Sequence, residues 1–407
     1  MRVAVASWSS RRFGGTGTYL AELFANLARH GHELAFLNEF DAPLEHPPLH
    51  PGSEVPTWTV DAIGIDQALA GLRAWKPDVL FAHGLVDPHN EERTLGVAPA
   101  VFFAHDYYGT CISGFKTHRL PTIQPCDRTF GWQCLGHYFP RRCGGLSPVS
   151  MVREFRKQAH RLDLLRSYQM IATHSDRMRD EYVRHGFDPS RVVKVPFGVG
   201  ADARMRSSRR AGEGSGPADT CRLLFVGRMY EIKGGRKLID ALPRVAHALQ
   251  RPIHLTFAGE GAQRPEWERR ASDLCAREPM VRIDFAGWLQ AEEVGCLYEQ
   301  ADVLVMPSLW PEPFGLVGVE AGLYGVPVAA YAVGGISEWL RPGVNGQLAS
   351  GNPPTVDGLA HAIIECLRDK NVHARLREGA MRLSRERTFE RHLLSLVSLF
   401  ERVRQAA

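Results

Sequence analysis

Residues 306–325 read MPSLWPEPFGLVGVEAGLYG, and this stretch decides the fold class. An apolar run ends at Met306, two glutamates follow eight positions apart, Glu312 and Glu320, and a second apolar run comes next. If a helix begins near Gly315, its first backbone N–H groups lack partners within the helix and form an anion site beside Glu312. We therefore expect a strand, an acidic anion-binding loop, a helix and a second strand. Two solvent-exposed acids near a helix start are the alternative interpretation.

Apolar runs alternate with helical patterns along most of the chain, which is typical of βαβ units around parallel sheets. Residues 201–220 interrupt this alternation with several Gly and Ser and no apolar periodicity, so we expect a linker there. The sequence thus predicts an α/β protein with two doubly wound domains, residues 1–200 and 221–386, and a ligand cleft at the carboxyl ends of their strands. The expected strands are Arg2–Ser7, Leu34–Leu37, Val79–Ala82, Ala100–Ala104, Met170–Thr173, Val192–Val195, Arg222–Val226, His254–Ala258, Arg282–Ala286, Val303–Met306 and Val326–Ala330.

Three helices are expected from their apolar periodicity. Thr18–His30 forms the first, and a second follows an irregular insert at residues 109–146. The last segment, residues 387–407, is expected to form a helix that crosses back onto the first domain. The stripe of the second helix comprises Val152, Phe155, Ala159 and Leu162, and that of the last comprises Leu393, Leu394, Val397 and Phe400.

Charge and composition exclude several classes of protein. The chain has 49 Lys and Arg against 45 Asp and Glu, a net charge of +4, which is too little for a dedicated nucleic-acid binder. No apolar stretch approaches the roughly 20 residues that span a bilayer, and the N-terminus lacks the apolar core of a signal peptide. We therefore expect a cytoplasmic protein. An NAD-linked dehydrogenase is excluded because no Gly-x-Gly-x-x-Gly opens a helix after a strand.

Two basic residues follow the expected strand at 222–226. Arg228 offers a planar fork of donors and Lys233 a compact charge, and both suit phosphate oxygens. The Gly pair after Lys233 would let backbone approach such a ligand, as would Gly14 and Gly15 before the first helix. A solvated surface pair and a structural turn are the alternative interpretations.

The segment at 306–325 resembles the E-x7-E motif of the retaining GT-B glycosyltransferases of family 4, and the resemblance covers most of the chain. It is carried also by Phe225-Val226-Gly227-Arg228, Lys233-Gly234-Gly235, Ala258-Gly259-Glu260-Gly261, Ala286-Gly287-Trp288-Leu289, Gly334-Gly335-Ile336-Ser337-Glu338, Gly14-Gly15 and Gly31-His32-Glu33. It implies the GT-B fold, with two Rossmann-like domains facing a cleft.

The resemblance also implies roles for individual residues. Glu320 would bind the nucleotide ribose and Glu312 the sugar hydroxyls, with the backbone of Phe314, Gly315 and Leu316 on phosphate and sugar. Leu289 would line the base pocket. His105, after the strand at 100–104, resembles the family's histidine near the reacting sugar, and a structural histidine is its alternative. The expected catalytic set is His105, Glu312, Arg228 and Lys233.

The function implied is retaining transfer of a hexosyl group from a UDP-, GDP- or ADP-sugar to a saccharide or lipid-linked acceptor, in synthesis of cell-surface polysaccharide or glycoconjugate. The chain contains no Asp-x-Asp, the acidic pair that holds Mg²⁺ or Mn²⁺ in many transferases, so the chemistry is expected to need no metal. The alternatives are a catalytically silent nucleotide-binding scaffold and a sugar-nucleotide epimerase or phosphorylase on the same fold.

The insert and the helix after it carry two further predictions. Cys111, Cys126, Cys134 and Cys143 are expected to share a structural zinc ion or iron–sulfur cluster, with His118 or His137 able to replace one ligand; unligated thiols and disulfides remain alternatives. The basic helix at residues 150–166 either packs with a solvated basic face or docks on anionic lipid at the inner face of the membrane.

Overall fold

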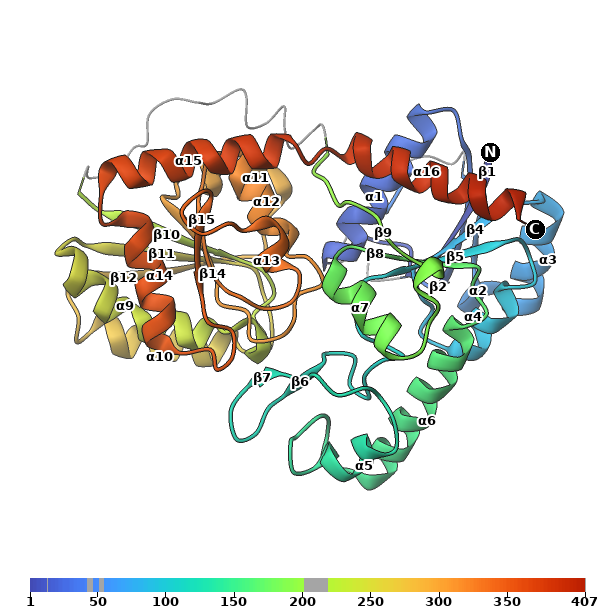
Figure 1. Cartoon of the computed structure of the whole chain (residues 1–407), viewed down its shortest axis with the longest axis horizontal. Helices are drawn as coiled ribbons and strands as arrows, with labels where there is room; N and C mark the ends of the chain where they lie inside the picture. The colour runs from blue at the N-terminus through green and yellow to red at the C-terminus, as the bar shows by residue number, and fades with distance from the viewer. Residues whose placement is uncertain (13, 42–46, 51–54, 201–218, 407) are drawn as a thin grey trace. The chain divides into compact units, whose positions relative to one another are not determined.

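The computed structural model describes residues 1–12, 14–41, 47–50, 55–200 and 219–406 (Figure 1). It divides the chain into two compact units. Unit 1 contains Met1–Lys116, Asp127–Pro196 and Glu390–Ala407, and unit 2 contains Thr117–Cys126 and Phe197–Phe389. Most of the expected linker, residues 201–218, lies outside the described residues.

Unit 1 is built on a seven-stranded parallel sheet with the order β3-β2-β1-β4-β5-β8-β9. Its central strands are buried on both faces, which is why the sequence shows continuous apolar runs rather than alternation. The strands are β1 (Arg2–Ser9), β2 (Glu33–Phe40), β3 (Thr57–Thr59), β4 (Val79–Ala82), β5 (Ala100–Ala104), β8 (Met170–Thr173) and β9 (Val192–Lys194). The helices are α1 (Gly14–Arg29), α2 (Val60–Ile63), α3 (Ile65–Trp75), α4 (Pro88–Thr94), α5 (Gln133–Tyr138), α6 (Pro148–Leu165), α7 (Asp176–Arg184) and α16 (Phe389–Gln405), with the 3-10 turn η1 (Pro189–Arg191).

Unit 2 is built on a six-stranded parallel sheet with the order β12-β11-β10-β13-β14-β15. The strands are β10 (Cys221–Val226), β11 (Ile253–Ala258), β12 (Val281–Gly287), β13 (Val303–Met306), β14 (Val328–Tyr331) and β15 (Gly346–Ala349). The helices are η2 (Glu231–Lys233), α9 (Gly235–Leu249), α10 (Arg264–Cys275), α11 (Ala291–Gln300), α12 (Leu316–Leu323), α13 (Ile336–Trp339), α14 (Val356–Leu367) and α15 (Lys370–Arg385). Both sheets therefore have the doubly wound order expected from the sequence, with switch points at β1/β4 and β10/β13.

The last helix, α16, packs within unit 1, as its place beside α1 in Figure 1 shows. Phe400 is fully buried and meets the ring of Phe81 on β4 edge-on at 4.9 Å between centroids. The predicted apolar face was partly wrong, because Leu394 is 57% exposed and Leu396 is buried in its place.

The predicted apolar stripe of α6 was also partly wrong, since Phe155, Ala159 and Leu162 are half-buried but Val152 is exposed. The buried residues of this helix include Gln158 and Arg161, whereas Val152 is exposed. Gln158 accepts a hydrogen bond from the backbone N–H of Gly109, 2.7 Å away, and Arg161 forms an ion pair with the buried Glu91. Apolar periodicity missed these two residues because α6 packs partly through polar contacts, beside the buried Leu164 and Leu165. Arg161 therefore does not belong to a solvated basic face.

The insert is ordered around a buried lysine that the sequence analysis passed over. The Nζ atom of Lys116 donates to the carbonyl oxygens of Thr110, 3.2 Å away, and Arg128, and forms an ion pair with Glu181 of α7. Both charged side chains are at most 2% exposed. A short antiparallel pair, β6 (Thr117–His118) and β7 (Gln124–Pro125), groups with unit 2 instead of the first domain to which the whole insert was assigned.

In the described part of the chain, no helix combines the length and apolar character needed to cross a membrane.

Candidate active site

The first component of the site in unit 2 is the turn that carries Lys233. Gly234 follows it with a φ of 72°, and a Cβ atom at this position would lie 1.9 Å from the carbonyl oxygen of Pro307, so only glycine fits. The backbone N–H of Leu309 donates to the carbonyl of Ile232 at 2.8 Å. The η2 turn is therefore held against the loop that follows β13.

This packing brings Lys233 to Glu312. The Nζ of Lys233 lies 2.5 Å from Oε1 of Glu312, and the hydroxyl of Ser308 donates to the same oxygen. Glu312 is only 6% exposed. Burial would raise its pKa, but the charge of Lys233 and the hydrogen bonds from Lys233 and Ser308 outweigh this effect and hold the pKa below its usual value. Glu312 is therefore a buried carboxylate beside a fixed cation.

The loop that carries Arg228 follows β10 and packs on the neighbouring loops. Gly259, after β11, approaches the backbone of Gly227 so closely that a Cβ atom would lie 2.1 Å from its carbonyl oxygen. The N–H of Gly259 in turn donates to the carbonyl of Gly287 at 2.7 Å. Arg228 itself is exposed, with its guanidinium 5.2 Å from the ring centroid of Tyr230. The guanidinium of Arg228 is therefore exposed to solvent, on a loop whose backbone packs closely against the neighbouring loop.

The predicted helix near Gly315 is confirmed, since α12 begins at Leu316 with Gly315 as its N-cap. The carbonyl of Phe314 accepts a hydrogen bond from the indole N–H of the buried Trp339 at 2.7 Å, which fixes the backbone before the helix. Glu320 is half-buried in the second turn of α12. Leu289, half-buried, lies between β12 and α11, next to the exposed Trp288.

In unit 1 the helix α1 begins four residues earlier than predicted, so Gly14 and Gly15 form its first turn. Glycine is tolerated there because the first N–H groups of a helix lack helical partners in any case. A Cβ atom at either position would meet no heavy atom of the described residues within 4 Å. Close packing therefore does not require glycine at either position.

His105 lies at the centre of a histidine cluster, which we define as His83, His105, His174 and His392. The Nε2 of His105 is 2.8 Å from Nδ1 of His83, and its Nδ1 is 3.3 Å from Nε2 of His174. Tyr19 of α1 contacts the cluster, with its hydroxyl 2.9 Å from Nε2 of His392. The sequence analysis found only His105, although His83, His105 and His174 each follow directly after a strand, β4, β5 and β8.

The cluster is electrically neutral at ordinary pH. Burial, with a contribution from His392, lowers the pKa of His105 to about 3, and burial lowers that of His392 to about 4. Burial also lowers the pKa values of His83 and His174 well below the usual 6.5. A neutral imidazole donates a hydrogen bond through one ring nitrogen and accepts one through the other. His83 and His174, on either side of His105, therefore fix the orientation of its ring.

Each unit of the chain matches the sequence profile of a known family. The sequence profile of glycosyltransferase family 4 matches residues 13–202, and that of the group 1 glycosyl transferases matches residues 215–382. The chain belongs to the family 4 glycosyltransferases.

Individual relatives agree with this assignment. Glycogen synthase from Mycobacterium tuberculosis is 29% identical over 410 residues, covering 91% of this chain and 86% of that protein. D-inositol 3-phosphate glycosyltransferase from Geodermatophilus obscurus is 34% identical over 252 residues, 57% of this chain and 52% of that protein.

Solved structures show the fold of this glycosyltransferase to be GT-B. HepE from Anabaena, in complex with UDP and glucose, is similar with a TM-score of 0.68 and 18% identity, over 98% of this chain and 99% of that chain. Sucrose-phosphate synthase from Thermosynechococcus elongatus has a TM-score of 0.70 and 19% identity, with both chains fully covered.

The four clustered cysteines of the glycosyltransferase are not brought together as a ligand set. Within the described residues, which include all four, the close groups of His, Cys, Asp and Glu ligand atoms do not contain them. Cys111 and Cys134 are near enough to interact electrostatically, while Cys126 groups with unit 2. Burial raises the pKa of Cys134. The metal centre was predicted because the insert was expected to need a cross-link, and the contacts of the buried Lys116 weaken that reason. The metal centre stays a prediction.

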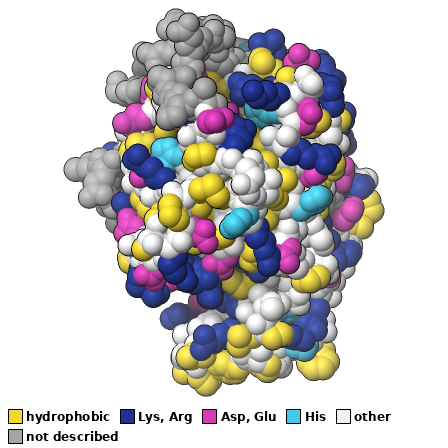
Figure 2. Space-filling view, turned by 90° about the vertical axis from the view of Figure 1, so that its left-hand side faces the viewer, with side chains coloured by type: hydrophobic (Ala, Val, Ile, Leu, Met, Phe, Trp, Pro, Cys, Tyr) yellow, Lys and Arg dark blue, Asp and Glu magenta, His cyan; other side chains and the backbone are white. Residues whose placement is uncertain are grey.

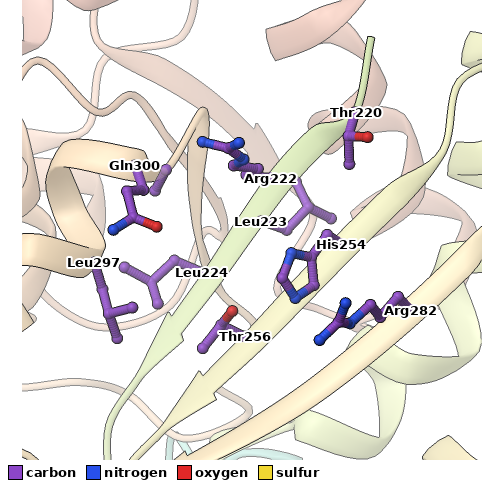
Figure 3. Close-up of a pocket in the computed structure, with 10 residues that line it drawn as sticks. Thr220, Arg222, Leu223, Leu224, His254, Thr256, Arg282, Leu297 and Gln300 are labelled. Atoms are coloured by element: carbon purple, nitrogen blue, oxygen red, sulfur yellow. The ribbon is translucent and has the colours of Figure 1, made fainter. Parts of the chain in front are cut away.

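A pocket of about 310 Å³ lies elsewhere in unit 2, near the amino ends of β10, β11 and β12 (Figure 3). Arg222, His254 and Arg282, each the second residue of its strand, point into it from one face of the sheet. Since Arg228 and Glu312 follow the carboxyl ends of β10 and β13, this pocket is separate from the residues expected to bind the donor.

Proposed function

We propose that this glycosyltransferase transfers a sugar from a nucleoside-diphosphate sugar with retention of configuration, and that the chemistry needs no metal ion. The observation that carries the proposal is the contact of Glu312 with Lys233 and Ser308 at the switch point β10/β13, beside the loop of Arg228. HepE has been solved with UDP and with UDP-glucose, which supports a nucleotide-sugar donor.

Each side chain has a distinct task in this mechanism. The departing diphosphate gains negative charge as its bond to the sugar breaks, and Arg228 and Lys233 stabilise that charge in place of a metal ion. Glu312, held ionised beside Lys233, accepts hydrogen bonds from sugar hydroxyls. Glu320 binds the ribose, and the N-terminus of α12 at Gly315 and Leu316 adds backbone donors.

We further propose that the leaving diphosphate takes the acceptor's proton on the same face of the sugar, so that no protein nucleophile is needed. His105 is neutral and both of its ring nitrogens face His83 and His174, so it lies beside the reacting sugar without exchanging a proton. The acceptor is a saccharide or a lipid-linked saccharide of cell-surface polysaccharide synthesis. A relative that makes glycogen and a similar structure from lipopolysaccharide biosynthesis support this acceptor class.

Thermal unfolding with UDP, GDP, ADP and the matching nucleosides, in the presence of EDTA, tests donor binding. One diphosphate at 100 times its dissociation constant should stabilise the protein by about 2.7 kcal/mol, and its nucleoside far less. Arg228→Ala should reduce the difference, because the exposed Arg228 acts on the phosphates, while Lys233 and the N-terminus of α12 remain. Arg269→Ala, an exposed arginine on α10, is the control and should keep it. Equal stabilisation by diphosphate and nucleoside would contradict the phosphate site.

A contact with anionic membrane lipid is the second proposal, and the surface around α5 and the start of α6 supports it. Trp132 is 83% exposed, Leu146 70% and Val149 77%, while Arg153 and Arg156 are exposed on α6. Figure 2 shows hydrophobic and basic side chains together at the bottom, the level at which Figure 1 draws α5. Apolar side chains that insert and basic ones that meet lipid phosphates together supply the two signals that stable attachment needs.

Vesicle sedimentation tests this contact. The protein should sediment with vesicles containing anionic lipid at low salt and not with neutral vesicles, and Trp132→Ala or Arg153→Glu should release it. Arg269→Glu, the same charge reversal on α10, should have no effect. Equal binding to neutral vesicles, or none at low salt, would contradict the proposal.

A further inference from the structure

Three potential metal ligands meet where α4 and α6 of unit 1 pack together. His89 and Glu92, three residues apart, lie on one face of α4, and His160 of α6 faces them. The Nε2 of His160 is 3.1 Å from Oε2 of Glu92, and the imidazole rings of His160 and His89 are 4.5 Å apart between centroids. One ligand atom from each of the three lies within 4.8 Å of the others. Among the described residues this is the one such group of His, Cys, Asp and Glu.

The two helices that carry these residues are fixed to each other by buried charge. Glu91, next to Glu92, is 1% exposed and pairs with Arg161, next to His160, at 3.0 Å. The hydroxyl of Tyr168 also donates to Glu91, 2.8 Å away. Because each buried partner is adjacent in sequence to a ligand, Glu92 and His160 are held opposite each other.

The start of α4 is fixed as well. Glu39, 5% exposed, accepts hydrogen bonds from the backbone N–H of Asp87 and the side chain of Asn90, each at 3.0 Å. His89 lies between these two positions. A site whose ligands are carried by rigid elements loses little entropy when it closes on an ion.

We propose that His89, Glu92 and His160 bind a divalent transition-metal ion of the zinc class, which links α4 to α6. Two imidazoles and one carboxylate are a ligand set that zinc adopts with a fourth, open position, whereas Ca²⁺ and Mg²⁺ prefer oxygen ligands alone. His89 and His160 line a pocket of about 560 Å³ together with Arg156 and Lys157. The positive charges of Arg156 and Lys157 repel a divalent cation, and the negative charge of Glu92 offsets part of this repulsion.

This site is separate from the residues proposed for sugar transfer and from the four clustered cysteines. Its expected effect is on the stability of unit 1, because an ion bound only by the folded form raises the temperature of unfolding. The inference does not depend on the proposed function, and its test needs no substrate.

The test is a Co²⁺ titration of tag-free, chelator-treated full-length protein, followed by visible absorption and by competition with Zn²⁺. We expect one equivalent of Co²⁺ to bind with the d–d absorption of nitrogen and oxygen ligands and without a thiolate charge-transfer band. Zn²⁺ should displace it and raise the unfolding temperature. His89→Ala, Glu92→Gln and His160→Ala should each weaken binding by more than about tenfold, since even outer-shell changes cost 10- to 100-fold.

Two controls keep the outcome decisive. His361→Ala, an exposed histidine on α14, and the pair Cys111→Ser with Cys134→Ser should leave Co²⁺ binding unchanged. Because His89 and Glu92 are exposed, circular dichroism should show that their variants fold. No Co²⁺ binding, Co²⁺ binding that is lost in the cysteine pair, or unchanged affinity in the three ligand variants would each overturn the proposal.

Discussion

At the scale of single residues, the contact between Lys233 and Glu312 joins two strand–helix units that lie 79 positions apart in sequence. Removing one charge leaves the other without its partner, which costs about 3–5 kcal/mol for a fully buried pair. The cost should be smaller here because the Lys233 side chain is 19% exposed.

A double-mutant cycle measures this coupling. Lys233→Ala and Glu312→Gln should each destabilise the protein in urea, and the double variant should lose less than their sum by about 1–3 kcal/mol. Additive losses, within about 0.5 kcal/mol, would mean that the two side chains do not stabilise each other.

The histidine cluster predicts how stability depends on pH. In the unfolded chain these imidazoles take up protons near pH 6.5, whereas His105 and His392 do so only at about 3 and about 4 when folded. The unfolded state therefore binds more protons below pH 6.5, so stability is full above that pH and is lost as the pH falls toward 4. Each histidine contributes a slope of up to about 1.4 kcal/mol per pH unit.

Urea unfolding between pH 8 and pH 4.5 checks this dependence. His392→Gln should reduce the slope by the share of one histidine, while the exposed His361→Gln should keep the wild-type slope. A wild-type protein whose stability does not change below pH 6.5 would contradict the buried, neutral cluster.

Sequence patterns could have located more of this cluster than they did. His83 and His174 follow predicted strands as directly as His105 does, and the carboxyl ends of parallel strands meet at one edge of a sheet. His392 and Tyr19 could not be found this way, because their place depends on how α16 and α1 pack across the chain.

At the scale of elements, strand positions were predicted well because buried parallel strands are continuous apolar runs. Val79–Ala82, Ala100–Ala104, Met170–Thr173 and Val303–Met306 match the structure residue for residue. Helix faces were predicted less well. Apolar periodicity cannot show that α6 buries Gln158 and Arg161, since each is stabilised by a partner far away in sequence.

The insert provides a test at this scale. Lys116→Met should destabilise unit 1 by up to about 3–5 kcal/mol, because the buried Glu181 would lose its buried cation and keep only the partly exposed Arg184 as a charged partner. Lys194→Met, which breaks the exposed pair with Asp176, should change the stability by less than about 0.5 kcal/mol. Urea unfolding distinguishes the two, and equal effects would show that the buried pair does not hold the insert.

At the scale of the whole molecule, α16 completes unit 1 from the far end of the chain. Phe400→Ala should cost about 3–5 kcal/mol by opening a cavity against Phe81. Leu394→Ala on the same helix should be nearly neutral because Leu394 is mostly exposed. Hydrogen exchange in α1 and β4 should rise in the first variant and not in the second.

The central claim is that this family 4 glycosyltransferase breaks a nucleotide–sugar bond with Arg228 and Lys233 in place of a metal ion. The most direct measurement is release of free nucleoside diphosphate from a panel of UDP-, GDP- and ADP-sugars in excess EDTA, with wild type and Arg228→Ala side by side. The account predicts that wild type releases diphosphate from one class of donor at an unchanged rate in EDTA. It also predicts that Arg228→Ala is slower by about 10²–10³-fold, the usual cost of removing one charge-stabilising donor. Loss of wild-type turnover in EDTA that added Mg²⁺ or Mn²⁺ restores, or full turnover by the variant, would contradict it.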